Sequence, residues 1–145
     1  SKNGKYLYLV QELDAGITAF SVAPDGKLTN IQETTLVTYS TKKNGAADIH
    51  LSPDGKFLYA TNRGEANTIT CFAVKKDGTV RFVEQYSTSG NGPRNFTITP
   101  DGKFLFVGNQ KSNNITVFSR NKCTGKLKML TDKVELGAPV CLLLY

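Results

Sequence analysis

Four side chains in this 145-residue chain are suited to proton transfer or anion binding, and two of them occupy matching places in an internal repeat. Glu12 and Arg63 stand at the equivalent end of one strand-like run in two copies of the repeat, and Gln110 stands there in the third copy. When the strands of a repeat stay similar but the residue at one strand end differs between copies, the differing residues often line a functional site. Neutral variation at the protein surface produces the same pattern. We therefore interpret Glu12 and Arg63 as catalytic candidates and Gln110 as a substrate-binding candidate.

Arg94 and His50 are the other two catalytic candidates. Arg94 follows Gly92-Pro93 as a strand begins, and its planar guanidinium suits a carboxylate or a phosphate. Because a desolvated charge is costly unless it is paired, a structural salt bridge is the alternative. His50 is the only histidine of the chain and could transfer protons near neutral pH. A hydrogen-bonded core residue is the alternative for His50, and Asp48, two residues earlier on the same strand face, could orient it.

The remaining candidates and the absent motifs narrow the chemistry further. No serine nucleophile elbow, phosphate-cradling glycine loop or carboxylate pair at ligand spacing is present. One histidine and three cysteines without a CxxC pair make no zinc motif. We therefore expect neither a metal nor another cofactor. Further substrate-binding candidates, each with turn or loop chemistry as its alternative, are Asp48, Asn62, Asn109 and Lys111.

Composition bears on the partners. The net charge of +6 comes from 18 basic and 12 acidic residues, but no basic stripe carries interleaved aromatic residues, so we expect no nucleic-acid partner. No apolar run approaches the roughly 20 residues that cross a bilayer, so no membrane partner is expected. The lysines are scattered, mostly in turns, at Lys5, Lys27, Lys56 and Lys103, with the pairs Lys42-Lys43 and Lys75-Lys76.

The cysteines and the first residue bear on location and completeness. Cys71, Cys123 and Cys141 are odd in number, which favours reduced thiols and a cytoplasmic location. The chain starts at Ser1 without an initiator methionine, and we interpret this as a fragment boundary.

The elements that must position these residues follow from the repeat. Residues 52–62 read SPDGKFLYATN, residues 99–109 read TPDGKFLFVGN, and a worn copy, NGKYLYLVQ, covers residues 3–11. Each copy is followed by a second apolar run, a glycine turn and a third run. Short runs rich in Val, Ile, Thr, Phe and Tyr between Asp-Gly turns predict strands. Runs that are apolar on both faces predict strands packed between neighbouring sheets.

Four strands in about 47 residues predict the blade of a β-propeller. We expect an all-β fold of about three four-stranded antiparallel blades. The predicted divisions are a blade without its inner strand at 1–40, full blades at 46–90 and 93–136, and a closing inner strand at 138–145. Because propellers close with 4–8 blades, we expect the open edges to pair with N-terminal blades of the same protein or with a second copy of the chain.

Several motifs resemble the seven-bladed propeller lactonase family, which includes propeller-type 6-phosphogluconolactonases and 3-carboxy-cis,cis-muconate lactonising enzymes. They are ADIH at 47–50, NRG at 62–64, GPR at 92–94 and NQKS at 109–112, together with VQEL at 10–13, where Gln11 departs from the usual asparagine. The likeness covers nearly the whole chain and implies the C-terminal part of a seven-bladed ring.

The resemblance implies an enzyme for a small anionic sugar lactone, inactive as the isolated chain. For hydrolysis, Glu12 or His50 would activate water, while Arg63 and Arg94 would hold the anionic group and stabilise the oxyanion. The same groups could serve a muconate cycloisomerisation, and the residues do not separate these two reactions. A non-enzymatic propeller that binds protein or cell-wall partners is the third alternative.

Overall fold

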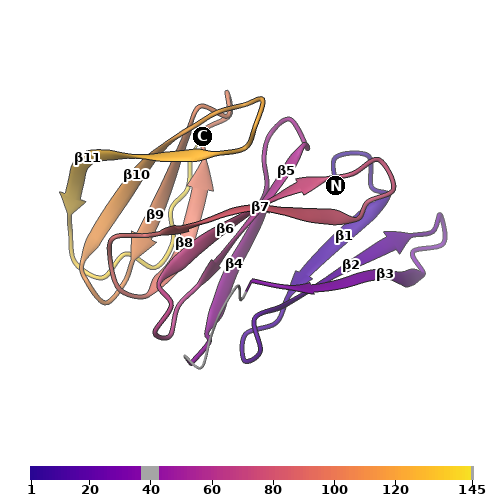
Figure 1. The fold of residues 1–145 in the computed structure, drawn as a ribbon, viewed down its shortest axis with the longest axis horizontal. Helices are drawn as coiled ribbons and strands as arrows, with labels where there is room; N and C mark the ends of the chain where they lie inside the picture. The colour runs from indigo at the N-terminus through magenta and orange to yellow at the C-terminus, as the bar shows by residue number, and fades with distance from the viewer. Residues whose placement is uncertain (37–42, 145) are drawn as a thin grey trace.

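The computed structural model describes residues 1–36 and 43–144, without the side chains of residues 131–133. Lys42 and Tyr145, which figure in the sequence predictions, lie outside the described residues. The fold is all-β, with three antiparallel sheets that stand side by side like the blades of a propeller (Figure 1). No helix among the described residues is long and apolar enough to cross a membrane.

Among the described residues the first blade has three strands in the order β1-β2-β3, with no strand on the inner side of β1. Its strands are β1 (Tyr6–Val10), β2 (Gly16–Val22) and β3 (Leu28–Thr35).

The other two blades have four strands each, paired in sequence order from β4 to β7 and from β8 to β11. The strands of the second blade are β4 (Ala46–Leu51), β5 (Phe57–Asn62), β6 (Thr68–Val74) and β7 (Val80–Ser87). Those of the third blade are β8 (Pro93–Ile98), β9 (Phe104–Asn109), β10 (Asn114–Arg120) and β11 (Leu127–Glu135).

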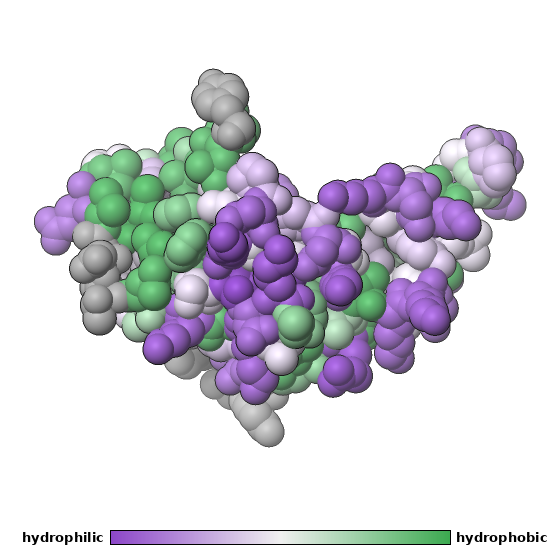
Figure 2. Space-filling model, turned by 90° about the horizontal axis from the view of Figure 1, so that it is seen from above, coloured by the Kyte–Doolittle hydropathy of each residue, from purple (hydrophilic) through white to green (hydrophobic). Residues whose placement is uncertain are grey.

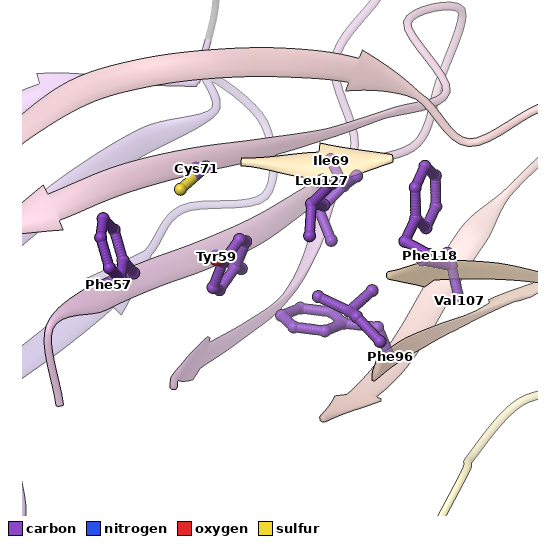
Figure 3. Packing of buried hydrophobic residues seen from close by; sticks show 9 residues of the cluster. Phe57, Tyr59, Ile69, Cys71, Phe96, Val107, Phe118 and Leu127 are labelled. Atoms are coloured by element: carbon purple, nitrogen blue, oxygen red, sulfur yellow. The ribbon is translucent and has the colours of Figure 1, made fainter. Parts of the chain in front are cut away.

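The hydrophobic core lies between the blades, because the middle strands are apolar on both faces. All of β5 is buried, and its alternate residues serve two clusters. Leu58 and Ala60 face the first blade. Phe57 and Tyr59 face the third blade, where Phe96 and Phe118 belong to the same nine-residue cluster, shown in Figure 3. Every blade therefore depends on a neighbour to bury its sheet faces.

Glycine turns fit one blade against the next on the face of the molecule that carries the Pro-Asp-Gly turns. Gly125 has a φ of 74°, and a Cβ there would clash with the ring of Phe57. The carbonyl of the same glycine accepts a hydrogen bond of 2.6 Å from the Tyr59 hydroxyl of the preceding blade. The first two blades repeat the arrangement, with a bond of 2.9 Å from Tyr8 to the carbonyl of Gly78. We call these two contacts the tyrosine latches.

The chain after β11 returns along the inner side of the third blade (Figure 1). The amide of Leu142 donates to Oδ1 of Asn95 on β8 at 2.6 Å. One repeat earlier, the amide of Phe96 donates to Oδ2 of Asp48 on β4 at 3.0 Å. Residues 138–144 therefore occupy the place of the next inner strand, although they join no ladder among the described residues.

Candidate functional site

A groove of about 400 Å³ opens on the molecular face opposite the Pro-Asp-Gly turns, across all three blades. Its walls come from the loop after β1, from the first halves of the inner strands β4 and β8, from the loop after β5, and from the returning C-terminal segment. The residues that line it are Val10, Glu12, Ala46, Ala47, Asp48, Arg63, Arg94, Asn95 and Val140. Four of the nine sequence candidates are among them.

Glu12 and Arg63 form an ion pair between the first and second blades. Nη2 of Arg63 lies 2.8 Å from Oε1 of Glu12. The Arg63 side chain is 22% exposed and that of Glu12 is 64% exposed, so the carboxylate is the more open partner. Nε of Arg63 donates to the carbonyl of Gly45 at 3.0 Å, which fixes the guanidinium. The amide of Ala46 donates to the carbonyl of Glu12 at 3.0 Å and joins the loop after β1 to the start of β4.

Arg94 is the free cation of the groove. It is the second residue of β8, it is exposed, and it forms no ion pair among the described residues. The alternative of a structural salt bridge therefore finds no carboxylate in this part of the protein. A guanidinium in this setting is available to a carboxylate or phosphate in the groove.

Asp48 and His50 project from the same face of β4, but they differ in their relation to the groove. Asp48 lines it, whereas His50 lies further along the strand, with Nε2 3.1 Å from Oδ2 of Asp48. The His50 ring meets that of Phe96 edge-on at 4.9 Å. Asp48 therefore orients His50, as its spacing suggested, and His50 is not among the residues that line the groove.

Asp48 also joins the inner strands of two blades. Its Oδ2 accepts from Nδ2 of Asn95 at 2.7 Å and from the amide of Phe96 at 3.0 Å. Partial burial alone would raise the pKa of this carboxyl, but the hydrogen bonds from His50 and from the Phe96 and Ile49 amides lower it below the ordinary value. Asp48 is therefore an ionised acceptor, and most of its capacity is used by the protein itself.

Asn62 and Asn109, which end β5 and β9, are buried beneath the loops rather than exposed on the rim. Oδ1 of Asn62 accepts from the amide of Gly45 at 3.0 Å. Nδ2 of Asn109 donates to the carbonyl of Thr88 and to Oγ1 of Thr116. Both side chains support loop backbone, which corresponds to the alternative of loop chemistry.

Gln110 and Lys111 lie in the loop after β9, on the groove face but outside the lining of the groove. Their amides donate to the carbonyls of Gly92 and Asn91, which ties this loop to the one before β8. Position 110 therefore matches Glu12 and Arg63 in the repeat without sharing their groove.

Asn95 is the groove residue that sequence reasoning missed. It bonds Asp48 on one side and the amide of Leu142 on the other. The spacing of 47 residues between positions 48, 95 and 142 was a usable signal, because equivalent inner-strand positions contact one another around a ring.

The groove thus combines a fixed carboxylate–guanidinium pair, a free guanidinium and a carboxylate–imidazole pair just beyond its wall. Such a set can bind an anion, transfer a proton and stabilise a developing oxyanion. Within the described residues no group of His, Cys, Asp and Glu side chains has the arrangement of a metal site.

Comparison with known proteins places the chain among lactonases. A family model described as "Lactonase, 7-bladed beta-propeller" matches residues 1–144. The 6-phosphogluconolactonase of Formosa agariphila is 40% identical over 148 residues, which cover 99% of this chain and 41% of that protein. The 6-phosphogluconolactonase of Bacillus subtilis is 36% identical over 141 residues, or 94% of this chain and 40% of that protein.

Solved structures agree with the sequence relatives. The periplasmic gluconolactonase of Pseudomonas aeruginosa superposes with a TM-score of 0.92 at 39% identity, over 96% of this chain and 39% of that one. The chain therefore spans about two fifths of the length of the relatives that it matches.

Proposed function

Because this chain belongs to the seven-bladed β-propeller lactonase family, we propose that the protein hydrolyses a small anionic sugar lactone, in the manner of a 6-phosphogluconolactonase. The observation that carries the proposal is the groove in which the Glu12–Arg63 ion pair faces the free cation Arg94. The names of the relatives support lactone hydrolysis as the reaction class.

In the proposed mechanism, Glu12 is the general base. Its exposed carboxylate takes a proton from a water molecule as the water oxygen attacks the lactone carbonyl carbon. The carbonyl oxygen becomes an oxyanion, which Arg63 stabilises with Nη1, since Nε and Nη2 are already used by Gly45 and Glu12. When the tetrahedral intermediate collapses, the bond to the ring oxygen breaks, and that oxygen receives the proton from Glu12 to become the new hydroxyl group.

Arg94 binds the anionic substituent of the substrate rather than the reacting carbonyl. It stands on β8, whereas the Glu12–Arg63 pair lies at the boundary between the first two blades. A substrate that spans the groove would place its phosphate or carboxylate at Arg94 and its lactone ring at the pair. Orientation by a charge at one end and chemistry at the other is an effective way to position a small substrate.

His50 has a supporting role in this proposal. Its hydrogen bond to Asp48 and its place beyond the groove wall favour Glu12 as the base. A contribution of His50 to catalysis would act through Asp48, and it would show as a pH dependence that His50→Gln removes.

The test compares two lactones on the full-length protein. Arg94→Ala should weaken binding of 6-phosphogluconolactone by about tenfold to a hundredfold, because a charge-assisted hydrogen bond contributes about 1.5–3 kcal/mol. The same variant should hydrolyse unphosphorylated gluconolactone at the unaltered rate. Glu12→Gln should lower turnover of both lactones by about a hundredfold or more with little change in KM.

All rates are measured above spontaneous hydrolysis, with and without chelator, and 3-carboxymuconate serves as the competing substrate. If Arg94→Ala lowers activity equally on both lactones, Arg94 does not bind the anionic group of the substrate. Turnover of 3-carboxymuconate alone would move the protein to the lactonising branch of the family, and turnover of neither compound would leave a binding scaffold.

We further propose that the remaining blades belong to the same protein and that it is cytoplasmic. The free cysteines Cys71, Cys123 and Cys141 support reducing surroundings. Fractionation of cells that produce the full-length protein tests the location.

A further inference from the structure

The positive charge of this chain is concentrated on one face. We call the side of the molecule that carries the Pro-Asp-Gly turns the turn face. It is formed by the segment before β1, by the loops between the first two strands of each full blade, and by the loops between the last two strands of every blade. Its loops hold nine lysines and four aspartates, a net charge of +5 out of the total of +6. In the described loops of the groove face, three basic and three acidic residues cancel.

The lysines of the turn face form a regular pattern. They recur after the Asp-Gly turns and cluster near the outer turns, so that each blade contributes several. All nine are exposed. They are Lys2, Lys5, Lys27, Lys56, Lys75, Lys76, Lys103, Lys122 and Lys126. Figure 2, which views this face, shows hydrophilic side chains across its middle.

The aspartates of this face are folded back onto their own turns. Each accepts a hydrogen bond from the amide two residues later, at 3.0–3.1 Å, as Asp25 does from Lys27 and Asp54 from Lys56. Two lysines have ion pairs, Lys103 with Asp101 at 3.4 Å and Lys126 with Glu84 at 3.2 Å. The other seven have none among the described residues. Their flexible four-carbon stems let the ammonium groups extend past the anchored carboxylates.

The composition of the turn face distinguishes between classes of partner. Specific protein interfaces are enriched in aromatic residues, Met and Arg at their centre and depleted in Lys, and this face has the opposite bias. Nucleic-acid sites add arginines and aromatic rings that stack on bases. Arg120, which ends β10 at this face, is buried, and the hydroxyls of Tyr6 and Tyr8 are bonded to backbone carbonyls. The exposed arginine and rings beside these turns are Arg81 and Phe82 on β7 and Phe104 on β9, against nine exposed lysines. What remains is a broad array of strongly hydrated point charges.

We propose that the turn face is a docking surface for a layer of anionic lipid headgroups, which leaves the groove on the opposite face open to solvent. The negative surface potential of anionic lipids attracts basic residues with about 1 kcal/mol for each Lys or Arg near the surface, and juxtamembrane clusters of four to eight basic residues bind such headgroups. This departs from our sequence expectation of no membrane partner, which rested on the absence of a spanning segment, since surface association needs none. The proposal is independent of the proposed function.

The experiment measures sedimentation of the full-length protein with vesicles of phosphatidylglycerol and phosphatidylcholine in a one-to-two ratio, against phosphatidylcholine alone. We expect binding to the anionic vesicles. The affinity should fall by about tenfold or more between about 50 and 200 mM salt, because the Debye length shortens as salt is added. The double variant Lys75→Glu, Lys76→Glu should weaken binding by at least about tenfold. The double variant Lys43→Glu, Lys111→Glu, the same charge change on two exposed residues of the groove face, is the matched control and should bind like the parent.

Several outcomes would overturn the proposal. They are equal binding to neutral vesicles, no binding to either kind, and equal losses for the turn-face and groove-face double variants. A duplex DNA oligonucleotide bound more tightly than the anionic vesicles at the same salt would identify a nucleic-acid surface instead. Circular dichroism of each variant confirms that the exposed substitutions leave the fold intact.

Discussion

Arg120 links the second and third blades on the turn face, and its loss should destabilise the fold in a way that depends on which partner is removed. The side chain of Arg120 is 0% exposed, whereas that of its partner Asp54 is 25% exposed. Nη2 of Arg120 lies 3.0 and 3.2 Å from the two carboxylate oxygens of Asp54. Nε donates to the Tyr59 hydroxyl and Nη1 to the carbonyl of Gly102.

The two single variants leave different charges behind. Arg120→Met keeps most of the volume and leaves a carboxylate that still reaches water and still accepts from Ser52 and Lys56. Asp54→Ala leaves a fully buried guanidinium without its counter-ion. Breaking a buried pair costs about 3–5 kcal/mol when the remaining charge is uncompensated. We therefore expect about 4 kcal/mol for Asp54→Ala and only about 2–3 kcal/mol for Arg120→Met, because partial exposure relieves the remaining carboxylate.

The free energy of unfolding of the full-length protein and its variants is measured by urea titration at pH 7, with the double variant included. Partial burial would raise the pKa of the Asp54 carboxyl, but hydrogen bonds from Ser52, Lys56 and Arg120 and the charge of Arg120 outweigh it and hold the pKa below its ordinary value. Because the folded pKa is the lower one, the contribution of Asp54 is present well above the ordinary pKa of an aspartate and is lost as the pH falls through the folded pKa. A larger cost for Arg120→Met than for Asp54→Ala, or a double variant that costs the sum of the two, would refute this reasoning.

Two further predictions concern the packing of blades. Gly125→Ala should cost about 1–3 kcal/mol more than Gly26→Ala, because both glycines have positive φ but only the Cβ at position 125 would meet the Phe57 ring. Equal thermal unfolding midpoints for the two variants would show that the loss of stability comes from backbone strain alone and not from the contact with Phe57. The second prediction is that the isolated chain pairs its open edges with another polypeptide, since β1 has no inner neighbour and residues 138–144 join no described ladder. Light scattering that finds a monodisperse monomer would contradict it.

The fold could be predicted because its determinants are local and repeated. Each strand is bounded by its own turn residues, and the 47-residue period places the strands of one blade on those of the next. Matching ends of equivalent strands share a face for the same reason. This was sufficient to place Glu12 and Arg63 in neighbouring loops, and the groove brings Arg94 beside them.

Burial within a loop and pairing between distant residues could not be predicted in this way. Asn62 and Asn109 look like rim residues in the sequence, because strand ends usually reach solvent, yet the loops fold over both side chains. Arg120 resembles any charged residue at the end of a strand, and its partner Asp54 is 66 residues away. Gln110 matches Glu12 and Arg63 in the repeat but borders a different loop. Such contacts depend on the angle between blades, which no single repeat specifies.

The two faces of the molecule depend on each other, because contacts on both faces cross the same boundaries between blades. The Glu12–Arg63 pair, the bonds from Asp48 to β8 and the groove itself all cross blade boundaries, so no blade holds the candidate site alone. The tyrosine latches and the Arg120–Asp54 pair cross the same boundaries on the turn face. Because packed β-sheets resist compression, contacts that set the spacing on the turn face also set it at the groove. A change in a latch, such as Tyr59→Phe, therefore acts on the groove through blade geometry rather than through direct contact.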